Sequence, residues 1–244
     1  MSGKATALNL SLCGMELALD PAGALYVPAE RTLVVSDLHL EKGSYFAARG
    51  QPLPPYDSLD TLARLEGALA RHDVARVVSL GDGFHDAEAG VRMAPAVAGR
   101  LAGLLARVDC VWIAGNHDPA PPAFLGGRRV AEFGLGALAL RHEPARGALG
   151  EVAGHLHPCA GLTLRGRRLR RRCFVADGER LLMPAFGAYA GGLDVGEPAI
   201  AELFGRGGFT AFLLGDAVYP IPSARLLAPG EAQPAWRLSG GLSG

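Results

Sequence analysis

The sequence predicts an α/β fold built around a largely parallel sheet. Short apolar runs rich in β-branched residues alternate with helical patterns between residues 32 and 118, which is the rhythm of βαβ units. After about residue 158 the helical periodicity disappears and short strand-like runs follow, so a second, mostly antiparallel layer is expected. With 49% hydrophobic residues, the 244-residue chain has enough apolar side chains to bury a sizeable core.

The first and last expected elements are strands. The N-terminal region, residues 8–35, is expected to form a hairpin that turns near "DPAG" at 20–23 and leads into the apolar run "TLVV". The later segments 162–184 and 209–222 show strand-like runs separated by turn residues. These segments supply the strands of the second layer.

Two helices are expected between the first three apolar runs, at residues 58–73 and 97–109. The first helix is expected to begin after an N-cap at Asp57 or Ser58, since short polar side chains cap helices well. Four leucines of this segment recur at helical spacing. They are Leu59, Leu62, Leu65 and Leu69.

The chain shows no internal repeat and no clear linker, so residues 1–230 are expected to form one domain. The remaining residues, 231–244, are expected to form a loose tail. Lys+Arg and Asp+Glu are equal at 24 each, so the field of the whole protein does not attract a polyanion. The exception is "RGRRLRRR" at 165–172, where a polyanion could be bound locally.

The sequence also indicates where the protein works. It contains no stretch of about 20 apolar residues, and the N-terminus lacks the layout of a secretory signal, so we expect a cytoplasmic protein without a membrane segment. The cysteines have no metal-ligand spacing, and neither a disulfide framework nor a zinc knuckle is expected. They are Cys13, Cys110, Cys159 and Cys173.

Five strand-like runs end in polar side chains of the kinds that bind metal ions. Carboxylates, imidazoles and an amide without any thiolate favour Mn²⁺, Fe or Zn²⁺ in a hydrolytic centre over a structural zinc site. On an extended backbone, the side chains of residues two apart point in the same direction. Each Asp-x-His or His-x-His pair is therefore expected to direct both of its side chains at one site. In order, the clusters are Asp37 and His39; Asp82; Asn116, His117 and Asp118; His142; and His155 and His157.

These motifs, Asp-x-His, Gly-Asp, Gly-Asn-His-Asp, a later His and Gly-His-x-His, together resemble the calcineurin-like metallophosphoesterase superfamily over about residues 33–158. The resemblance implies an α/β/β/α sandwich of two mixed β-sheets flanked by helices. It also implies two divalent metal ions that share a water and hold a phosphate for in-line attack. One ion would be bound by Asp37, His39 and His157, the other by Asn116, His142 and His155, with Asp82 bridging both.

The resemblance implies catalytic roles for two further residues. His117 would contact the phosphate and donate a proton to the leaving oxygen, and Asp118 could then orient the His117 ring. His85 and Asp86 follow the bridging aspartate closely. For these two, support of the ligands or contact with substrate is one interpretation, and a plain loop hydrogen bond is the other.

Three segments, "SDLHLEKGSYFAARGQPLPPYD", "SLGDGFHD" and "LLMPAFGAYAGGLDV", resemble the bacterial DNA ligase-associated metallophosphoesterases, the PdeM family, which are described as DNA-damage-response endonucleases. This resemblance covers about residues 10–220. It implies a manganese-dependent phosphodiesterase or endonuclease that acts on DNA in repair, in association with a DNA ligase and a helicase.

Candidate substrate contacts lie close to the predicted ligands. Arg165, Arg167 and Arg168 belong to the arginine cluster that follows His157, and phosphate contacts near the metals would suit them. A solvated strand face is the alternative. Arginines also flank the His142 motif: Arg128, Arg129, Arg141 and Arg146.

Tyr45 and Phe46 follow the first ligand pair and could stack on a base or pack in the core.

The metal motifs do not identify the substrate. Besides a DNA-directed phosphodiesterase or endonuclease, a small-molecule phosphoesterase acting on nucleotides or cyclic nucleotides would use the same ligands. A non-catalytic scaffold of the same fold is the third hypothesis, and it would need no metal pair. Steep salt dependence of substrate binding would favour the first hypothesis.

Overall fold

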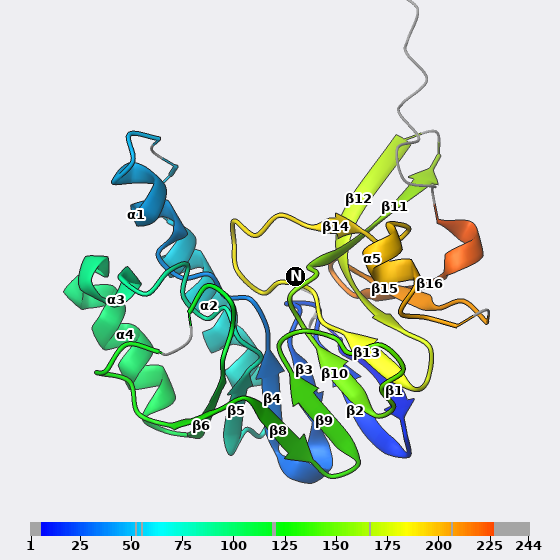
Figure 1. The fold of residues 1–244 in the computed structure, drawn as a ribbon, viewed down its shortest axis with the longest axis horizontal. Coiled ribbons are helices and arrows are strands. Elements are labelled where there is room, and N and C mark those ends of the chain that lie inside the picture. Colours follow the sequence, from blue (N-terminus) through cyan, green and yellow to red (C-terminus); the bar gives the residue numbers. More distant parts are fainter. Residues whose placement is uncertain are drawn as a thin grey trace, which may run out of the picture.

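The computed structural model describes residues 6–51, 53–54, 56–118, 121–165, 167–205 and 207–226. Within these ranges the chain forms two mixed β-sheets packed against each other, with helices gathered beside the first sheet (Figure 1). The predicted α/β fold is confirmed. The expected tail at 231–244 lies outside the described residues. No helix in the described ranges is long and apolar enough to cross a membrane.

The first sheet has seven strands that follow one another in sequence order. They are β1 (Leu8–Leu12), β2 (Met15–Leu19), β3 (Leu25–Val27), β4 (Thr32–Val35), β5 (Arg76–Ser79), β6 (Asp109–Ile113) and β7 (Arg128–Val130). The strands from β1 to β4 pair antiparallel, whereas β4 to β7 pair parallel. The predicted turn joins β2 to β3, where the Gly23 N–H donates to Asp20 O at 2.8 Å. The sheet is therefore mixed, because the N-terminal strands extend the parallel part.

The second sheet contains nine strands and is also mixed. They are β8 (Glu132–Leu135), β9 (Leu138–Arg141), β10 (Glu151–Ala153), β11 (Pro158–Leu164), β12 (Arg167–Ala176), β13 (Arg180–Leu182), β14 (Leu193–Asp194), β15 (Thr210–Leu214) and β16 (Val218–Pro222). The pairs β9·β10, β10·β13 and β11·β14 are parallel, and the other described pairs are antiparallel. The expectation of a mostly antiparallel second layer is confirmed.

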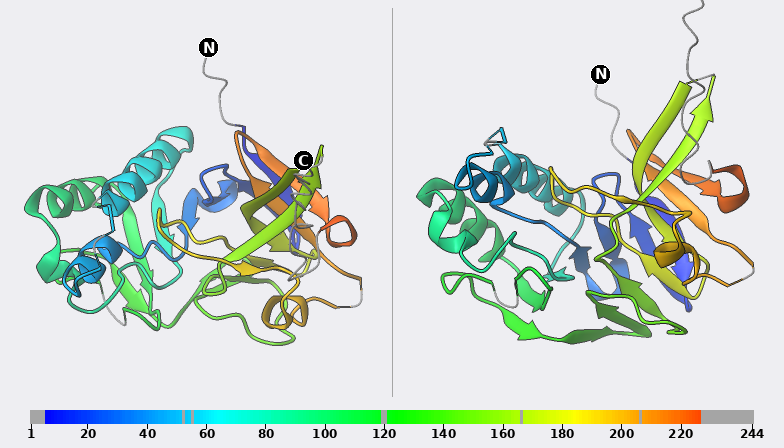
Figure 2. Two further views of the ribbon diagram at one scale, coloured as in Figure 1. Left: turned by 90° about the horizontal axis from the view of Figure 1, so that it is seen from above. Right: turned by 45° about the horizontal axis from the view of Figure 1, so that its top comes forward.

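The helices are distributed unequally between the two sheets (Figure 2). The outer face of the first sheet carries α2 (Asp57–Arg71) and α4 (Pro95–Leu105), with the short α1 (Lys42–Ala47) and α3 (Ala89–Arg92) beside them. Among the described residues, the second sheet carries only α5 (Pro198–Ala201), whose Ile200 packs on its outer face. The second helical layer of the expected sandwich is therefore reduced to one turn.

Three buried apolar clusters hold these layers together. The largest lies between the sheets and includes Val34 and Val78 from the first sheet and Leu140 and Phe174 from the second. A second cluster joins the first sheet to α2 and α4, and a third joins the second sheet to α5. Because the central cluster draws on both sheets, we propose that residues 1–230 form a single domain.

The start of α2 differs from the prediction. The helix begins at Asp57 after Tyr56, which makes no side-chain cap. Instead, the Asp57 carboxylate accepts from the Gly43 N–H at 2.9 Å, and the Ser58 hydroxyl donates to the Glu41 carboxylate at 2.9 Å. The two expected capping side chains therefore hold the start of α1, at Glu41 and Gly43. A tertiary contact has replaced a local one.

We predict that the leucines of α2 contribute unequally to stability. Leu62 is 1% exposed and belongs to the cluster beneath α2, whereas Leu59 is 38% exposed. Leu62→Ala should lower the free energy of unfolding by about 2–5 kcal/mol, and Leu59→Ala by about 0.5 kcal/mol or less. Urea denaturation measures both, and equal losses would contradict the observed face of α2.

Candidate metal centre

The candidate site lies where the carboxyl ends of strands from both sheets meet. The first three predicted clusters follow β4, β5 and β6, which are parallel neighbours in the first sheet. The last two follow β9 and β10, which are parallel neighbours in the second sheet. Neighbouring parallel strands end at the same sheet edge, so each sheet supplies one part of the site.

Five of the seven predicted metal ligands have a left-handed backbone. They are Asp37 (φ 52°), His39 (φ 43°), Asp82 (φ 46°), His155 (φ 68°) and His157 (φ 46°). The expectation that the Asp-x-His and His-x-His pairs are extended is wrong. This conformation costs a non-glycine residue about 1–3 kcal/mol, and it concentrates at functional sites, where the surrounding structure enforces it.

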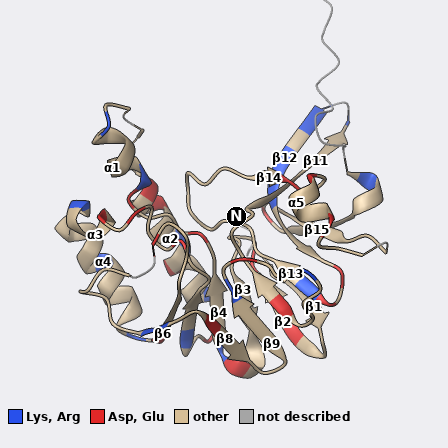
Figure 3. Cartoon of the chain, in the orientation of Figure 1, with Lys and Arg blue, Asp and Glu red and all other residues tan. Residues whose placement is uncertain are grey.

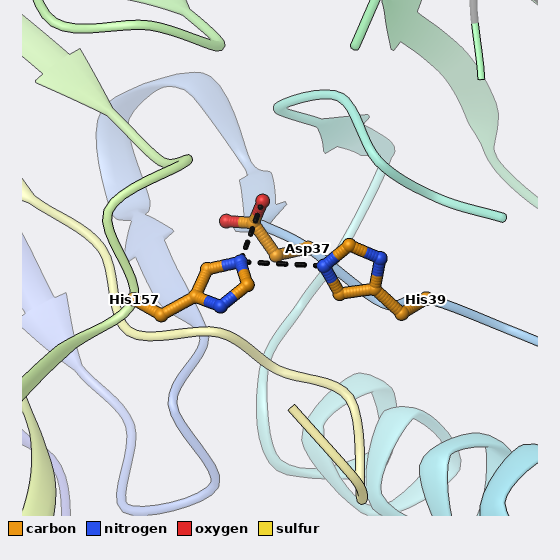
Figure 4. Close-up of side chains that lie close together, drawn as sticks. All are labelled: Asp37, His39 and His157. Atoms are coloured by element: carbon orange, nitrogen blue, oxygen red, sulfur yellow. Dashed lines mark hydrogen bonds and ion pairs between the residues drawn. The ribbon is translucent and has the colours of Figure 1, made fainter. Parts of the chain in front are cut away.

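The first group consists of Asp37, His39 and His157 (Figure 4). The Nε2 atom of His157 lies 3.2 Å from Asp37 Oδ1 and 3.3 Å from His39 Nε2. Burial lowers the pKa of His39 to about 3, so its imidazole is neutral. A neutral imidazole offers a nitrogen lone pair, which is the form that binds a metal ion.

The carboxylate of Asp37 is fully buried and held at one oxygen. The Ser36 hydroxyl donates a short hydrogen bond to Oδ2, and the His155 N–H donates to the same oxygen at 3.0 Å. Burial alone would raise the pKa of Asp37, but the hydrogen bonds from His157 and Ser36 hold it below its usual value. The result is an ionised carboxylate whose other oxygen, Oδ1, faces His157.

The second group consists of Asp82, His142 and His155, with Asn116 beside them. The Oδ1 atom of Asn116 lies 2.8 Å from His142 Nε2 and 3.0 Å from His155 Nδ1. The Oδ2 atom of Asp82 lies 3.6 Å from His142 Nε2, while its Oδ1 accepts from the His117 N–H at 2.9 Å. The side chains of this group therefore converge on one point.

The donor set of the second group suits a cation. The Nδ1 of His142 lies 2.7 Å from the Leu80 carbonyl, which requires a proton on Nδ1 and directs Nε2 at the group. This Nε2 lies 2.8 Å from Asn116 Oδ1, an amide oxygen that can bind a cation. Carboxylate, imidazole and amide groups directed at one point are ligands that a divalent cation takes in a hydrolytic centre. The geometry thus fits a divalent metal ion.

All seven residues proposed as ligands come together in these two groups. Asp82 lies with the second group, and its role as a bridge to the first remains a prediction. None of the cysteines belongs to either group. Cys110, Cys159 and Cys173 are buried free thiols, and Cys13 is an exposed free thiol.

The structure places Asp118 differently from the prediction. Its Oδ2 accepts from the Phe84 N–H at 2.8 Å, and the Nδ1 of His117 instead lies 3.2 Å from the His85 carbonyl. Burial and the neighbouring Asp82 raise the pKa of Asp118 to about 7. The carboxyl group of Asp118 therefore holds the loop that carries Asp82 and does not orient His117.

His85 and Asp86 have different roles: His85 contacts a residue of the site, whereas Asp86 makes local contacts in its loop. The ring of His85 stacks on His117 with 5.4 Å between centroids, so it supports a residue of the site. Asp86 forms an ion pair with Arg92 at 2.8 Å and accepts from the Glu88 N–H. It therefore organises α3 and takes no part in the described metal groups.

The predicted arginine cluster also divides into inner and outer residues. Arg172 is half-buried, and its Nη1 donates to the carbonyls of Ala185 and Gly187 at 2.8 and 3.0 Å. We call residues 185–193, which cross between the two halves of the molecule in Figure 1, the strap. Arg165, Arg167 and Arg168 are exposed on or beside β12, farther from the strap.

Tyr45 and Phe46 are neither fully exposed, as base stacking would favour, nor fully buried in the core. Both are half-buried in α1 and pack against His85, with ring centroids 4.5 and 5.8 Å away. Burial is the main reason why the pKa values of His39 and His85 are lowered, and the positive charge of Lys42, which sequence reasoning missed, adds to the effect. The sequence feature that could have revealed it is a lysine three residues after His39, the first of the predicted histidine ligands.

Two mixed sheets that hold a cluster of carboxylates and imidazoles at their strand ends define a metal-dependent phosphoesterase. Residues 30–177 match the family model described as calcineurin-like phosphoesterase. This match covers more than half of the chain, so the chain belongs to the calcineurin-like phosphoesterase family, whose members use divalent metals. No curated protein sequence matches the chain.

Two solved structures are similar to this chain. The crystal structure of Pseudomonas putida nuclease MPE shares 35% identity and a TM-score of 0.68, covering 88% of this chain and 100% of that chain. Yfce, a phosphoesterase from E. coli, shares 20% identity and a TM-score of 0.35, covering 74% of this chain and 87% of that chain.

We predict that Gly115→Ala disrupts metal binding. A Cβ atom at Gly115 would lie 2.2 Å from the Asp82 backbone N and 2.2 Å from Asp82 Oδ1, so the Asp82 loop must move. The stoichiometry of bound Mn²⁺, measured by elemental analysis, should fall from about two ions to one or fewer. Gly99→Ala in α4 is the matched control, because its Cβ would meet nothing within 4 Å. Full occupancy in Gly115→Ala would contradict this placement of Asp82.

Proposed function

We propose that this protein hydrolyses phosphodiester bonds of DNA, as an endonuclease in ligase-associated DNA repair in the cytoplasm. The observation that carries the proposal is the convergence of two ligand groups, one around Asp37 and one around Asp82, at the junction of the two sheets. A pair of metal ions can activate water for hydrolysis, and membership of the calcineurin-like phosphoesterase family favours phosphoesters as the substrates. The 35% identity to a nuclease supports a nucleic-acid substrate.

The donor set supports two divalent cations, for which we propose Mn²⁺, with Fe or Zn²⁺ as alternatives. Asp37, His39 and His157 would hold one, and Asn116, His142 and His155 the other, with Asp82 between them. When bound, the cations supply an activated water and neutralise phosphate charge. The protein fixes the directions of the carboxylate and imidazole ligands before substrate arrives.

We assign proton donation to His117. Its side chain is exposed at the site, and its Nδ1 faces the His85 carbonyl at 3.2 Å, so this nitrogen carries a proton that it donates to the carbonyl oxygen. When the ring carries a second proton on Nε2, it can give that proton to the leaving oxygen of the ester and return to the neutral form with its proton on Nδ1. The stacked ring of His85 limits the orientations of His117.

The resemblance to the DNA ligase-associated family supports the repair setting. A DNA ligase and a helicase are the partners that this resemblance proposes. A small-molecule phosphoesterase would use the same metal centre, so the choice between substrates requires a direct measurement.

We predict that the manganese-loaded protein hydrolyses a bis-aryl phosphodiester and single-stranded DNA faster than a mononucleotide. The three substrates are assayed in parallel by product release. Asp82→Asn is the blank, because it removes a charge from the candidate metal centre, and its activity should fall by at least about 100-fold. Hydrolysis of the mononucleotide alone would keep the metal chemistry and overturn the DNA assignment.

His117→Ala and Asp82→Asn should fail in different ways. His117→Ala should retain bound Mn²⁺ and lower kcat by about 10²–10⁴-fold for esters with poor leaving groups, which need a proton donor. With an activated aryl leaving group the loss should be much smaller. Asp82→Asn should lose metal and slow all substrates. Equal loss of metal in both variants would contradict the role given to His117.

A further inference from the structure

The outer parts of β11 and β12 form a two-stranded ribbon that projects from the body of the protein (Figures 1 and 2). Residues 160–164 pair with 167–171, and we call these residues the arginine ribbon. Among the described strands, β14 pairs with β11 only up to Cys159, and β15 joins β12 only from Cys173 onward. The arginine ribbon thus has no further strand beside it.

Positive charge is concentrated on this ribbon, as the blue outer end of β12 shows (Figure 3). Its four arginines are exposed: Arg167, Arg168, Arg170 and Arg171. The sequence of β11 and β12, residues 158–176, contains no Asp or Glu. Charged side chains can simply protect strand edges from pairing with other chains, and this alternative must be separated from a binding role.

The two faces of the arginine ribbon have different neighbours: one borders the strap, and the other packs partly on the cluster beneath α5. Strand alternation places Arg168 and Arg170 on the face of Arg172, and Arg167 and Arg171 on the opposite face. Arg170 Nη2 donates to the Gly192 carbonyl at 2.6 Å, so the first face borders the strap. On the opposite face, Ala160 and Leu162 pack into the cluster beneath α5.

The face that borders the strap is continuous with the candidate metal centre. Within the strap, the Gly187 N–H donates to the Asp37 carbonyl at 3.1 Å. At the base of the ribbon, His157 directly precedes β11, and its carbonyl accepts from the Leu193 N–H at 3.1 Å. A chain of contacts therefore leads from the ligand group to Arg170 and then outward to Arg168.

We propose that the face of the arginine ribbon bearing Arg168 and Arg170 binds the phosphate backbone of the nucleic-acid strand that is cut at the metal centre. The inference rests on the proposed nuclease function and adds where the uncut part of the substrate lies. Guanidinium groups suit this task because they bind phosphate oxygens bidentately and keep their charge.

The spacing of the arginines matches a nucleic-acid backbone. Alternate residues on a strand lie about 6.6–6.8 Å apart, which is close to the rise of two nucleotides along one strand of a B-form helix, about 6.8 Å. The six residues from Pro158 to Thr163, which pairs with Arg168, are separated by five steps along the strand and span about 17 Å. The face therefore reaches about five nucleotides from the metal centre.

The test compares two double variants of the same ribbon. Arg168→Gln/Arg170→Gln alters the proposed face, and Arg167→Gln/Arg171→Gln removes the same charge from the opposite face. Single-stranded DNA of 3 and 12 nucleotides and the bis-aryl diester serve as probes with Mn²⁺ present. Arg107→Gln is the control, because Arg107 is exposed between α4 and the amino end of β6, whereas the candidate metal centre lies at the carboxyl ends of the strands. The single variant Arg168→Gln leaves the bond to the strap intact.

The proposed face predicts a selective loss. For Arg168→Gln/Arg170→Gln, the ratio of kcat/KM on the 12-mer to kcat/KM on the diester should fall at least about tenfold, with a smaller fall on the 3-mer. The slope of log kcat/KM against log salt should become shallower by about 1.4, since each phosphate contact on a single strand contributes about 0.7. Arg168→Gln alone should lower the ratio in the same direction, and Arg107→Gln should leave it unchanged.

Three results would overturn the inference. Equal losses in the two double variants would indicate general charge attraction and no defined face. DNA cleavage that is unchanged in both would leave the arginines only an edge-protecting role. If the wild type cuts the diester but not the 12-mer, the proposed nuclease function itself fails, and the inference fails with it.

Discussion

The hydrogen bonds that hold the carboxylate of Asp37 join the two sheets at the candidate metal centre. The Ser36 hydroxyl and the His155 N–H donate to the same oxygen, although Ser36 follows β4 in the first sheet and His155 follows β10 in the second. The strap adds N–H donors from Phe186 and Gly187 to the carbonyls of Ser36 and Asp37. One buried peptide segment therefore receives hydrogen bonds from both sheets and from the strap, and these bonds set how the parts of the site meet.

The energetics of this arrangement favour a bound cation. Asp37 and Asp82 are buried carboxylates, and a buried charge costs several kcal/mol unless other groups compensate it. The left-handed backbones of five candidate ligands add about 1–3 kcal/mol each. Neutral imidazoles such as that of His39 cannot offset negative charge. Divalent ions would do so, and part of their binding free energy would then stabilise the fold.

Much of the site could be predicted from sequence because strand ends and side-chain chemistry are local signals. The parallel strands β4, β5 and β6 bring their terminal polar residues together whatever the details of the loops. The rest depends on distant partners. Asp57 looked like a helix cap and binds Gly43, and Asp118 looked like a partner of His117 and binds Phe84. A short polar side chain can satisfy many backbone donors, and only the folded chain decides which.

The arginine run at 165–172 also shows that distant partners decide what a residue does. Arginines of this one stretch of sequence have different roles in the structure. At its inner end, Arg172 is half-buried and ties β12 to the strap through backbone carbonyls, which is a structural task. Farther out, the side chains have no acidic residue on their own strands and face solvent. The boundary falls where β12 loses its neighbour β15, before Cys173. Strand pairing beyond the local sequence therefore determines which of the arginines are available to a ligand, and composition alone could not divide them.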